Sequence, residues 1–145
     1  MKLSLTQKAY IAGFLDADGS IYVRAKPNST YRFGYQIAPY IVFYQSSKSE
    51  LFKKMYSLIP FGRVRIRKDG VTEYIISKRD DLIVFIAMIQ PFLILKQKQI
   101  TLLLKILKQK ELVNNEKDFE KILQLCNKFQ NLNYSKKRKI RTLCP

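Results

Sequence analysis

Hydrophobic and polar positions change their spacing along the chain, and each change predicts a new element of secondary structure. Residues 5–16 carry apolar side chains at helical spacing, and the preceding Ser4 forms a capping box with Gln7. Gly19 stands where the chain must leave that helix. Residues 20–26 then alternate polar with apolar side chains, which is typical of a strand with one buried face. The chain is therefore expected to open with a helix that runs directly into a strand.

A second strand is predicted for residues 32–45, after a loop at 27–30. Pro39 lies inside this strand, and because proline cannot donate a hydrogen bond to a ladder, it indicates an edge position or a bulge. A helix over about residues 49–58 is expected to follow.

A hairpin comes next, with strands at 63–67 and 71–76 joined by a glycine-containing turn. Ser77 is expected to cap a third helix, and Asp80 and Asp81 in its first turn complement the helix dipole. These elements extend the order to two helices alternating with two pairs of strands, followed by a third helix.

Two more helices are predicted toward the C-terminus, one at 96–111 after Pro91 and one that begins at Asn115. The last helix has an amphipathic stripe of Phe119, Ile122, Leu123, Cys126 and Phe129. The fold class is therefore α+β, with the order αββαββα and an antiparallel four-stranded sheet that carries helices on one face. The length predicts a single domain over residues 1–145, with a basic tail at 135–145.

The net charge of the chain indicates which class of partner it binds. The chain has 27 Lys and Arg against 11 Asp and Glu, a net charge of +16, which favours a polyanionic partner. Nucleic acid fits best, and a membrane surface or an acidic protein comes second. The longest apolar run, residues 82–89, is too short to span a bilayer, and the first residues lack a secretory signal, so an intracellular protein is expected.

The residue types also exclude some chemistry. The chain has no histidine, which excludes histidine general bases, Ser-His-Asp catalysis and histidine metal ligands. Its two cysteines, Cys126 and Cys144, do not have a metal-ligand spacing, and Cys126 is interpreted as a core thiol.

Residues 11–19 read Ile-Ala-Gly-Phe-Leu-Asp-Ala-Asp-Gly at the end of the first predicted helix. This segment closely resembles the LAGLIDADG motif, with apolar residues replacing apolar ones at every departure. Ala9 and Gly13 are small residues four apart, a spacing that lets two helix backbones approach closely. Two copies packed about a two-fold axis would place two Asp18 carboxylates side by side, and such a pair calls for a divalent cation.

Beyond the motif, the chain from about residue 6 to residue 143 is similar to single-motif, intron-encoded LAGLIDADG homing endonucleases. The resemblance implies a saddle-shaped sheet, a homodimer, and cleavage of double-stranded DNA at a long, roughly palindromic site with short 3′ overhangs. Mg²⁺ is the expected cofactor, and Mn²⁺ or Ca²⁺ is expected to substitute for it in binding. The host compartment would be a prokaryotic cytoplasm or nucleoid, or an organelle.

The resemblance also assigns roles in catalysis and assembly. Asp18 would bind metal together with the backbone carbonyl of Ala17, Lys96 would approach the scissile phosphate, and Gln45 would lie near the active-site water. Where relatives carry a basic residue at the periphery of the site, this chain has Ser49 with Lys48 beside it, so no second basic group is assigned. The expected dimer interface comprises Ala9, Ala12, Gly13 and Asp16. Helical geometry turns Asp16 about 200° from Asp18, so Asp16 is interpreted as structural or supporting rather than metal-binding.

DNA contacts are expected from three parts of the chain. Arginines at 63, 65 and 67 alternate with apolar residues, so they project from one face of their strand; a solvated edge strand is the alternative. The resemblance extends the set to the first hairpin and the C-terminal loop. The candidate DNA-binding residues are Tyr22, Arg24, Lys26, Asn28, Thr30, Tyr31, Arg32, Gln36, Arg63, Arg65, Arg67, Lys68, Glu73, Ser135, Lys136 and Lys137. Base contacts are expected among Tyr22, Arg24, Gln36, Arg65 and Arg67, and phosphate contacts at Lys136 and Lys137.

Two other functions stay open at this point. A maturase that binds its own intron RNA shares this fold, and a DNA-binding regulator could be built on it. Retention of Asp18 and Lys96 argues against a pure maturase but not against a dual role. Metal-dependent nicking of DNA separates the endonuclease from both alternatives.

Overall fold

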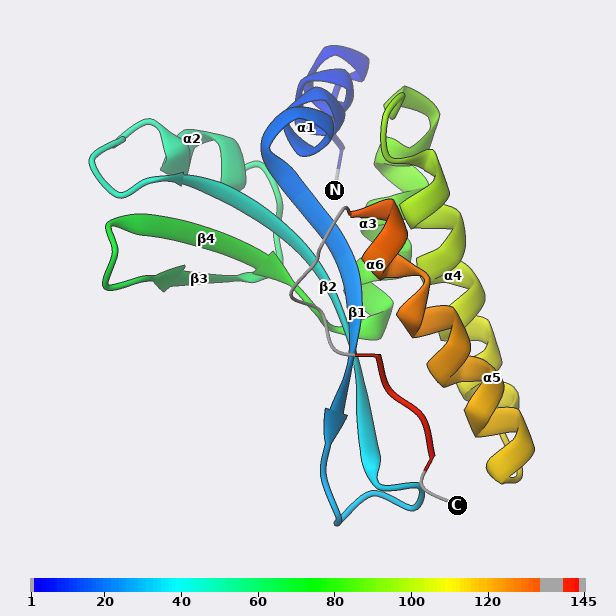
Figure 1. Ribbon diagram of the computed structural model, residues 1–145. Helices are drawn as coiled ribbons and strands as arrows, with labels where there is room; N and C mark the ends of the chain where they lie inside the picture. The colour runs from blue at the N-terminus through cyan, green and yellow to red at the C-terminus, as the bar shows by residue number, and fades with distance from the viewer. Residues whose placement is uncertain (1, 134–139, 144–145) are drawn as a thin grey trace. The chain divides into compact units, whose positions relative to one another are not determined.

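The computed structural model describes residues 2–133 and 140–143. Its elements follow the predicted αββαββα order with helices after it (Figure 1). They are α1 (Leu5–Asp18), β1 (Gly19–Pro27), β2 (Tyr35–Ser46), α2 (Phe52–Tyr56), β3 (Arg63–Ile66), β4 (Val71–Ile76), α3 (Arg79–Ile89), the 3-10 helix η1 (Gln90–Phe92), α4 (Gln97–Leu112), α5 (Glu116–Asn127) and α6 (Phe129–Leu132).

The four strands form one sheet in the order β1-β2-β4-β3. Pairing is antiparallel between β2 and β4 and between β4 and β3, which makes β3 an edge strand. Pro39, expected at an edge position or a bulge, lies in β2, an inner strand of the sheet. It lies before the residues of β2 that pair with β4, because this pairing begins only at Ile41, opposite Ile76.

The chain divides into two compact units. The first comprises Met1–Ile21 and Tyr40–Gln97, and it holds α1, α2, α3, β3 and β4. Phe43 of β2 is fully buried at its centre, with ring centroids 5.7 Å from Phe14 of α1 and 6.0 Å from Phe85 of α3. Phe52 of α2 stacks on Phe14 at 5.9 Å. In this unit the helices thus share one face of the sheet, as predicted, because a single aromatic cluster joins them.

The second unit comprises Tyr22–Pro39 and Lys98–Pro145. Its core forms where Phe119 of α5 stacks on Phe33, with centroids 4.8 Å apart. The whole predicted stripe is buried, but its last residue, Phe129, belongs to the separate helix α6. Asn115 caps α5 by accepting from the Asp118 amide at 2.8 Å, as expected. Cys126 is buried, which confirms its place in the core, whereas Cys144 lies outside the described residues.

Residues near the C-terminus are fastened to this second unit. The Asn127 side chain donates to the Arg141 carbonyl at 2.8 Å and accepts from its amide at 3.0 Å. Glu120 accepts from the Leu143 amide at 3.0 Å. In the part of the chain that the structure describes, no helix has the length and apolar character needed to cross a membrane.

The ends of the helices test the local predictions. The capping box of Ser4 and Gln7 is present, with both hydrogen bonds formed. Gly19 follows α1 in extended rather than left-handed backbone, and it is needed for space, because a Cβ there would lie 2.4 Å from the Leu15 side chain. The predicted cap of α3 was wrong: Lys78 takes the N-cap position, and the Ser77 hydroxyl accepts from Arg63 at 3.2 Å instead.

Candidate active site

The C-terminal end of α1 is fixed by one carboxylate. Asp16 accepts hydrogen bonds from three successive backbone amides, those of Ile94 at 2.7 Å, Leu95 at 3.1 Å and Lys96 at 3.1 Å. The side chain of Lys96 adds a second contact, because its Nζ donates to the Asp16 backbone carbonyl at 2.7 Å. These contacts fit the structural role expected for Asp16, and they bring the predicted catalytic lysine to the end of the helix that carries Asp18.

Asp18 itself is the last residue of α1 and is exposed, as is Ala17 before it. Asp16 and Asp18 therefore differ completely in environment although they are two residues apart. In the described residues no group of three or more Cys, Asp or Glu is placed to hold a metal ion, so one chain offers a single carboxylate at this position. A cation bound by carboxylates here would need a second Asp18.

Gln45 lies on the side of β2 that faces α1. It is two residues beyond Phe43, which packs against α1, and side chains two apart on a strand share a face. Its Oε1 accepts from the Ser46 amide at 2.9 Å. The nearby turn holds the Ser49 amide 3.0 Å from the Ser46 carbonyl, and Lys48 is exposed. The exposed ammonium of Lys48 therefore lies next to Ser49 in the chain.

The outward side of α1 is apolar and built from small residues. Leu5 is 70% exposed, and Ala9, Gly13 and Ala17 follow it at intervals of four on an exposed stripe. A Cβ added at Gly13 would meet nothing within 4 Å, so packing in this chain gives no reason for a glycine. Ala12, included in the expected interface, is fully buried in its own chain and has no surface to offer a partner, which corrects that assignment.

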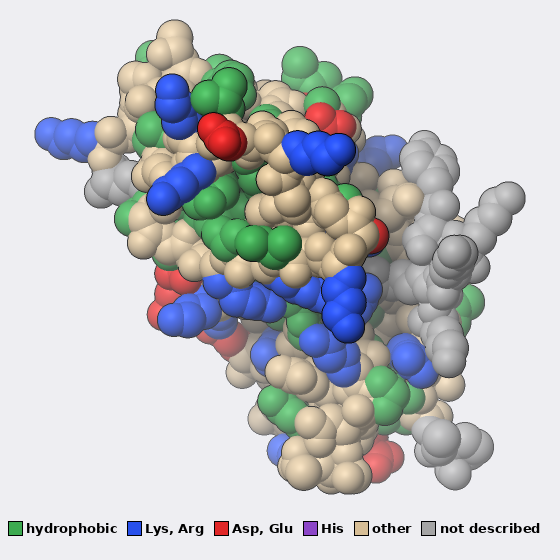
Figure 2. Space-filling model, turned by 90° about the vertical axis from the view of Figure 1, so that its left-hand side faces the viewer, with side chains coloured by type: hydrophobic (Ala, Val, Ile, Leu, Met, Phe, Trp, Pro, Cys, Tyr) green, Lys and Arg blue, Asp and Glu red, His purple; other side chains and the backbone are tan. Residues whose placement is uncertain are grey.

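The opposite face of the sheet in this unit carries arginines. Tyr44, Glu73 and Arg65 are cross-strand neighbours on β2, β4 and β3, and they point away from the side that contains Phe43 and Tyr74. We call the surface of Arg63, Arg65, Arg67, Glu73 and Tyr44 the arginine face. Figure 2 views the molecule from the side of the β3–β4 hairpin and shows Lys and Arg side chains gathered in a band.

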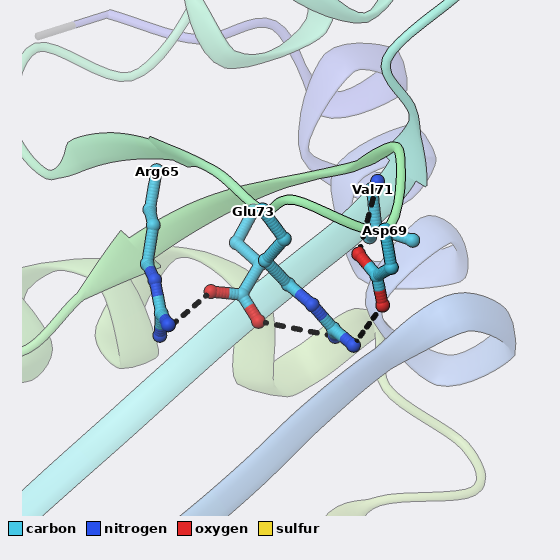
Figure 3. A network of polar contacts seen from close by, with 5 residues as sticks. Arg65, Asp69, Val71 and Glu73 are labelled. Atoms are coloured by element: carbon cyan, nitrogen blue, oxygen red, sulfur yellow. Dashed lines mark hydrogen bonds and ion pairs between the residues drawn. The ribbon is translucent and has the colours of Figure 1, made fainter.

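Carboxylates order these arginines. Glu73 is only 8% exposed, and its two oxygens lie 3.5 Å from Arg65 and 3.5 Å from Arg67 (Figure 3). Asp69 in the hairpin turn binds Arg67 from the other side. The hydrogen bond and the charge of Asp69 raise the pKa of Arg67, with a smaller contribution from Glu73. Lys68 beside them is exposed.

The first hairpin, in the second unit, presents another polar row. Tyr22, Arg24 and Lys26 alternate with the buried Val23 and Ala25, and the Arg24 guanidinium lies 5.4 Å from the centre of the Tyr22 ring. Gln36 on β2 is half-buried.

The loop of that hairpin is ordered by Asn28, whose side chain accepts from the Thr30 amide at 3.0 Å and from its hydroxyl at 2.7 Å. Tyr31 is 44% exposed. Arg32 departs from the expectation: it donates to the Asn114 carbonyl at 2.9 Å and stacks on Phe33, so it ties the loop to the α4–α5 connection. Ser135, Lys136 and Lys137 lie outside the described residues.

Comparison with known proteins identifies the arrangement. A family model described as LAGLIDADG endonuclease matches residues 11–108. The chain belongs to the LAGLIDADG endonuclease family. DNA endonuclease I-CreI of Chlamydomonas reinhardtii is 40% identical over 134 residues, which cover 90% of this chain and 80% of that protein. DNA endonuclease I-CvuI of Chlorella vulgaris is 30% identical over 136 residues, 91% of this chain and 83% of that one.

Solved LAGLIDADG structures agree with this. The crystal structure of I-CvuI with its target in the presence of Ca matches with a TM-score of 0.86 at 28% identity, covering 93% of this chain and 87% of that chain. I-CvuI with the I-CreI target in the presence of Mg, in which the DNA is not cleaved, matches with a TM-score of 0.86 at 27% identity, covering 92% and 86%. The four-stranded antiparallel sheet with its helices is thus the LAGLIDADG fold.

Two polar contacts of this LAGLIDADG chain were not predicted from the sequence. The ion pair of Asp69 with Arg67 was not predicted, although a carboxylate two residues from an arginine is a signal for one. The hydrogen bond between Ser77 and Arg63 had no local signal, because it depends on the pairing of β3 with β4.

Proposed function

We propose that this protein is a homing endonuclease that cuts both strands of DNA at a long, roughly palindromic site, using divalent metal, preferably Mg²⁺. The observation that carries the proposal is the end of α1, where Asp18 is exposed and where Lys96 is held by hydrogen bonds to Asp16. A carboxylate and a positioned ammonium at one helix end are suited to hydrolysis of a phosphodiester.

Activity requires two copies of the chain. One chain supplies one exposed carboxylate at α1, and the small-residue stripe on that helix allows a second α1 to approach closely. Ile94 is 82% exposed and Leu95 71% exposed, and their amides are bound by Asp16, so their apolar side chains adjoin the same helix end. Burying these side chains together with the stripe favours a homodimer in which the two Asp18 carboxylates meet.

The residues present fit a divalent cation. Carboxylate and backbone carbonyl oxygens are the hard ligands that such cations prefer, and the paired Asp18 side chains with the Ala17 carbonyls would hold it. When bound, the cation lowers the pKa of water and stabilises charge on the phosphate and the leaving 3′ oxygen.

The other residues of the site act on the phosphate and the water. Lys96 spends one of its three N–H donors on the Asp16 carbonyl, which leaves donors to neutralise a phosphate oxygen. Gln45 orients the attacking water, and because the chain has no histidine, the proton leaves through solvent. These roles rest on placement and on the family motif.

The DNA lies against the arginine face and the polar row of the first hairpin. Arginine and lysine neutralise phosphates, and arginine also reads guanine in the major groove. The net charge of +16 supports this assignment, as does the band of basic side chains in Figure 2.

Replacing Asp18 tests the proposal. Asp18→Asn keeps the size of the side chain but removes one charge per chain, so cleavage of plasmid DNA in Mg²⁺ should fall by about a hundredfold or more. Folding should persist, and DNA binding in chelator should persist or tighten, because repulsion from the phosphates disappears. Asp80→Asn is the matched control, since Asp80 is exposed on α3 and pairs only with a neighbouring arginine at 3.2 Å in the described contacts. Strong cleavage by Asp18→Asn would refute the mechanism, and absence of metal-dependent cleavage in the unmodified protein would refute the function.

A further inference from the structure

Four charged side chains form a chain of contacts across the β3–β4 hairpin (Figure 3). Arg65 binds one oxygen of Glu73, Arg67 binds the other, and Arg67 also binds Asp69. Glu73 is therefore shared between the two arginines, whereas Asp69 serves Arg67 alone.

The two arginines consequently differ in what they can offer to DNA. Arg65 is 68% exposed in its side chain, and its described contact uses one terminal nitrogen. Arg67 is 37% exposed, and its two terminal nitrogens are each taken by a different carboxylate. Arginine recognises guanine by directing two N–H donors at O6 and N7 of the base. Arg65 can do this while keeping Glu73, whereas both terminal nitrogens of Arg67 already lie on carboxylates, so a base must compete with Asp69 and Glu73 for them.

The backbone of the turn places Asp69 for this contact. The Arg67 amide donates to the Val71 carbonyl at 2.8 Å, and the Gly70 amide donates to the Arg67 carbonyl at 3.3 Å, with Gly70 in a left-handed conformation. The second oxygen of Asp69 accepts from the Val71 amide at 3.4 Å. Asp69 is thus oriented toward Arg67 by the same turn that sets the position of Arg67.

The geometry points to Asp69 as a specificity-determining residue that withholds Arg67 from base edges, leaving Arg65 as the guanine-reading arginine of this strand. The inference rests on the proposed function, because it needs a sequence-specific DNA complex. Asp69 acts through Arg67, so it is a positioning residue. An exposed ion pair shifts an equilibrium by no more than about fivefold, which is enough to alter the preference at one base pair without altering the site as a whole.

Asp69→Asn tests the inference. Asparagine retains an oxygen for the Val71 amide and suits the turn, but it removes the charge that holds Arg67. The probe is a pool of random-sequence duplexes bound to the dimer in Ca²⁺, recovered and sequenced. We expect Asp69→Asn to gain a guanine preference of about two- to fivefold at one symmetric pair of positions, with the other positions unchanged. Arg65→Ala should lose an existing guanine preference, and Arg67→Ala should change base preference little.

Two controls make the result specific. The double variant Asp69→Asn with Arg67→Ala should lose the gain, because no arginine is then released. Asp80→Asn removes an exposed carboxylate that also pairs with a neighbouring arginine, but on α3, and it should leave the base preferences as they are.

The inference is wrong if Asp69→Asn strengthens binding to all duplexes equally, if the gain survives in the double variant, or if Arg67→Ala alone erases a guanine preference. If the unmodified protein enriches no sequence at all, the proposed site-specific function fails and this inference fails with it. That outcome differs from the first three, because in those the unmodified protein still selects a site.

Discussion

The end of α1 and the β3–β4 hairpin both combine carboxylates with cationic side chains, but they fix them in different ways. At α1 the carboxylate of Asp16 binds three backbone amides, and Lys96 binds a backbone carbonyl. In the hairpin the partners are side chains, and Arg65 and Arg67 are 68% and 37% exposed. Contacts to backbone are set by the fold and cannot be exchanged, whereas exposed ion pairs can be exchanged for contacts to DNA. Catalytic geometry and sequence recognition thus use the same residue types with different rigidity.

Gly13→Leu should have the largest effect, because it tests whether the fixed end of α1 needs a second copy. A Cβ at position 13 meets nothing within 4 Å in its own chain, and leucine favours a helix over glycine by up to about 1 kcal/mol, so the chain itself should not be destabilised. Close approach of a second α1 should be blocked, and double-strand cleavage should be lost. Sedimentation and a cleavage assay measure the two effects. Thr101→Leu, at an exposed position of α4, is the control, and a Gly13→Leu dimer with full activity would contradict the assembly.

Asp16→Asn should have the next largest effect. The amide group cannot accept all three backbone hydrogen bonds, so we expect a loss of about 2 kcal/mol in the free energy of unfolding. Displacement of Lys96 should also lower the cleavage rate at saturating DNA by about tenfold to a hundredfold, with DNA affinity retained. Denaturant titration and single-turnover cleavage check both, with Asp80→Asn as the control. A stability loss with an unchanged cleavage rate would show that Asp16 does not position Lys96.

Glu73→Gln tests the ion pairs of the β3–β4 hairpin, which can be exchanged for contacts to DNA. Removing the shared charge loosens the guanidinium of Arg65 while Asp69 still binds Arg67, so discrimination among bases at the position that Arg65 contacts should weaken by about 1–2 kcal/mol. The cleavage rate at saturating DNA should stay the same, because the catalytic residues are fixed elsewhere. Glu50→Gln removes an exposed carboxylate outside the network and is the control. Unchanged base preferences with slower cleavage would reverse the roles given to the two regions.

Tyr74→Phe should have the smallest effect, confined to stability. The Tyr74 hydroxyl donates to the Phe61 carbonyl behind the hairpin, and losing it should cost about 1 kcal/mol. Burial, and to a lesser extent the charge of Asp81, raises the pKa of Tyr74. The tyrosine's contribution to stability is therefore full below its ordinary pKa of about 10 and declines as the pH rises above it. Denaturation curves between neutral and alkaline pH should show less alkaline loss for Tyr74→Phe, and an equal loss in both proteins would contradict the assignment.

Sequence predicted best those features whose cause is local. The capping box at Ser4 and the cap at Asn115 involve residues three apart, and the hairpin turn needs a glycine where the backbone is left-handed, at Gly70. The family motif singled out Asp18, the resemblance beyond the motif singled out Lys96, and helical geometry separated Asp16 from Asp18.

Features that depend on distant pairing were not predictable in the same way. Ser77 could not be recognised as a partner of Arg63, because the register of β3 against β4 decides that contact. For Pro39 an edge position and a bulge both stayed open, because the sequence does not say where β4 stops pairing. The three amides bound by Asp16 lie far along the chain, so its structural role could be predicted but its partners could not.

The hydrogen bonds from the backbone amides of residues 94 and 95 to Asp16 have a consequence for hydrogen exchange. Ile94 and Leu95 project their side chains into solvent, at 82% and 71% exposure, yet their amides are bonded to a carboxylate. Their backbone deuterium uptake should therefore be slow even though their side chains are open to water. Association of two chains would cover the side chains and leave these amides bonded as before. Deuterium uptake at these two residues then reports on their hydrogen bonds to Asp16. The reactivity of a surface label placed at Ile94 reports separately on assembly.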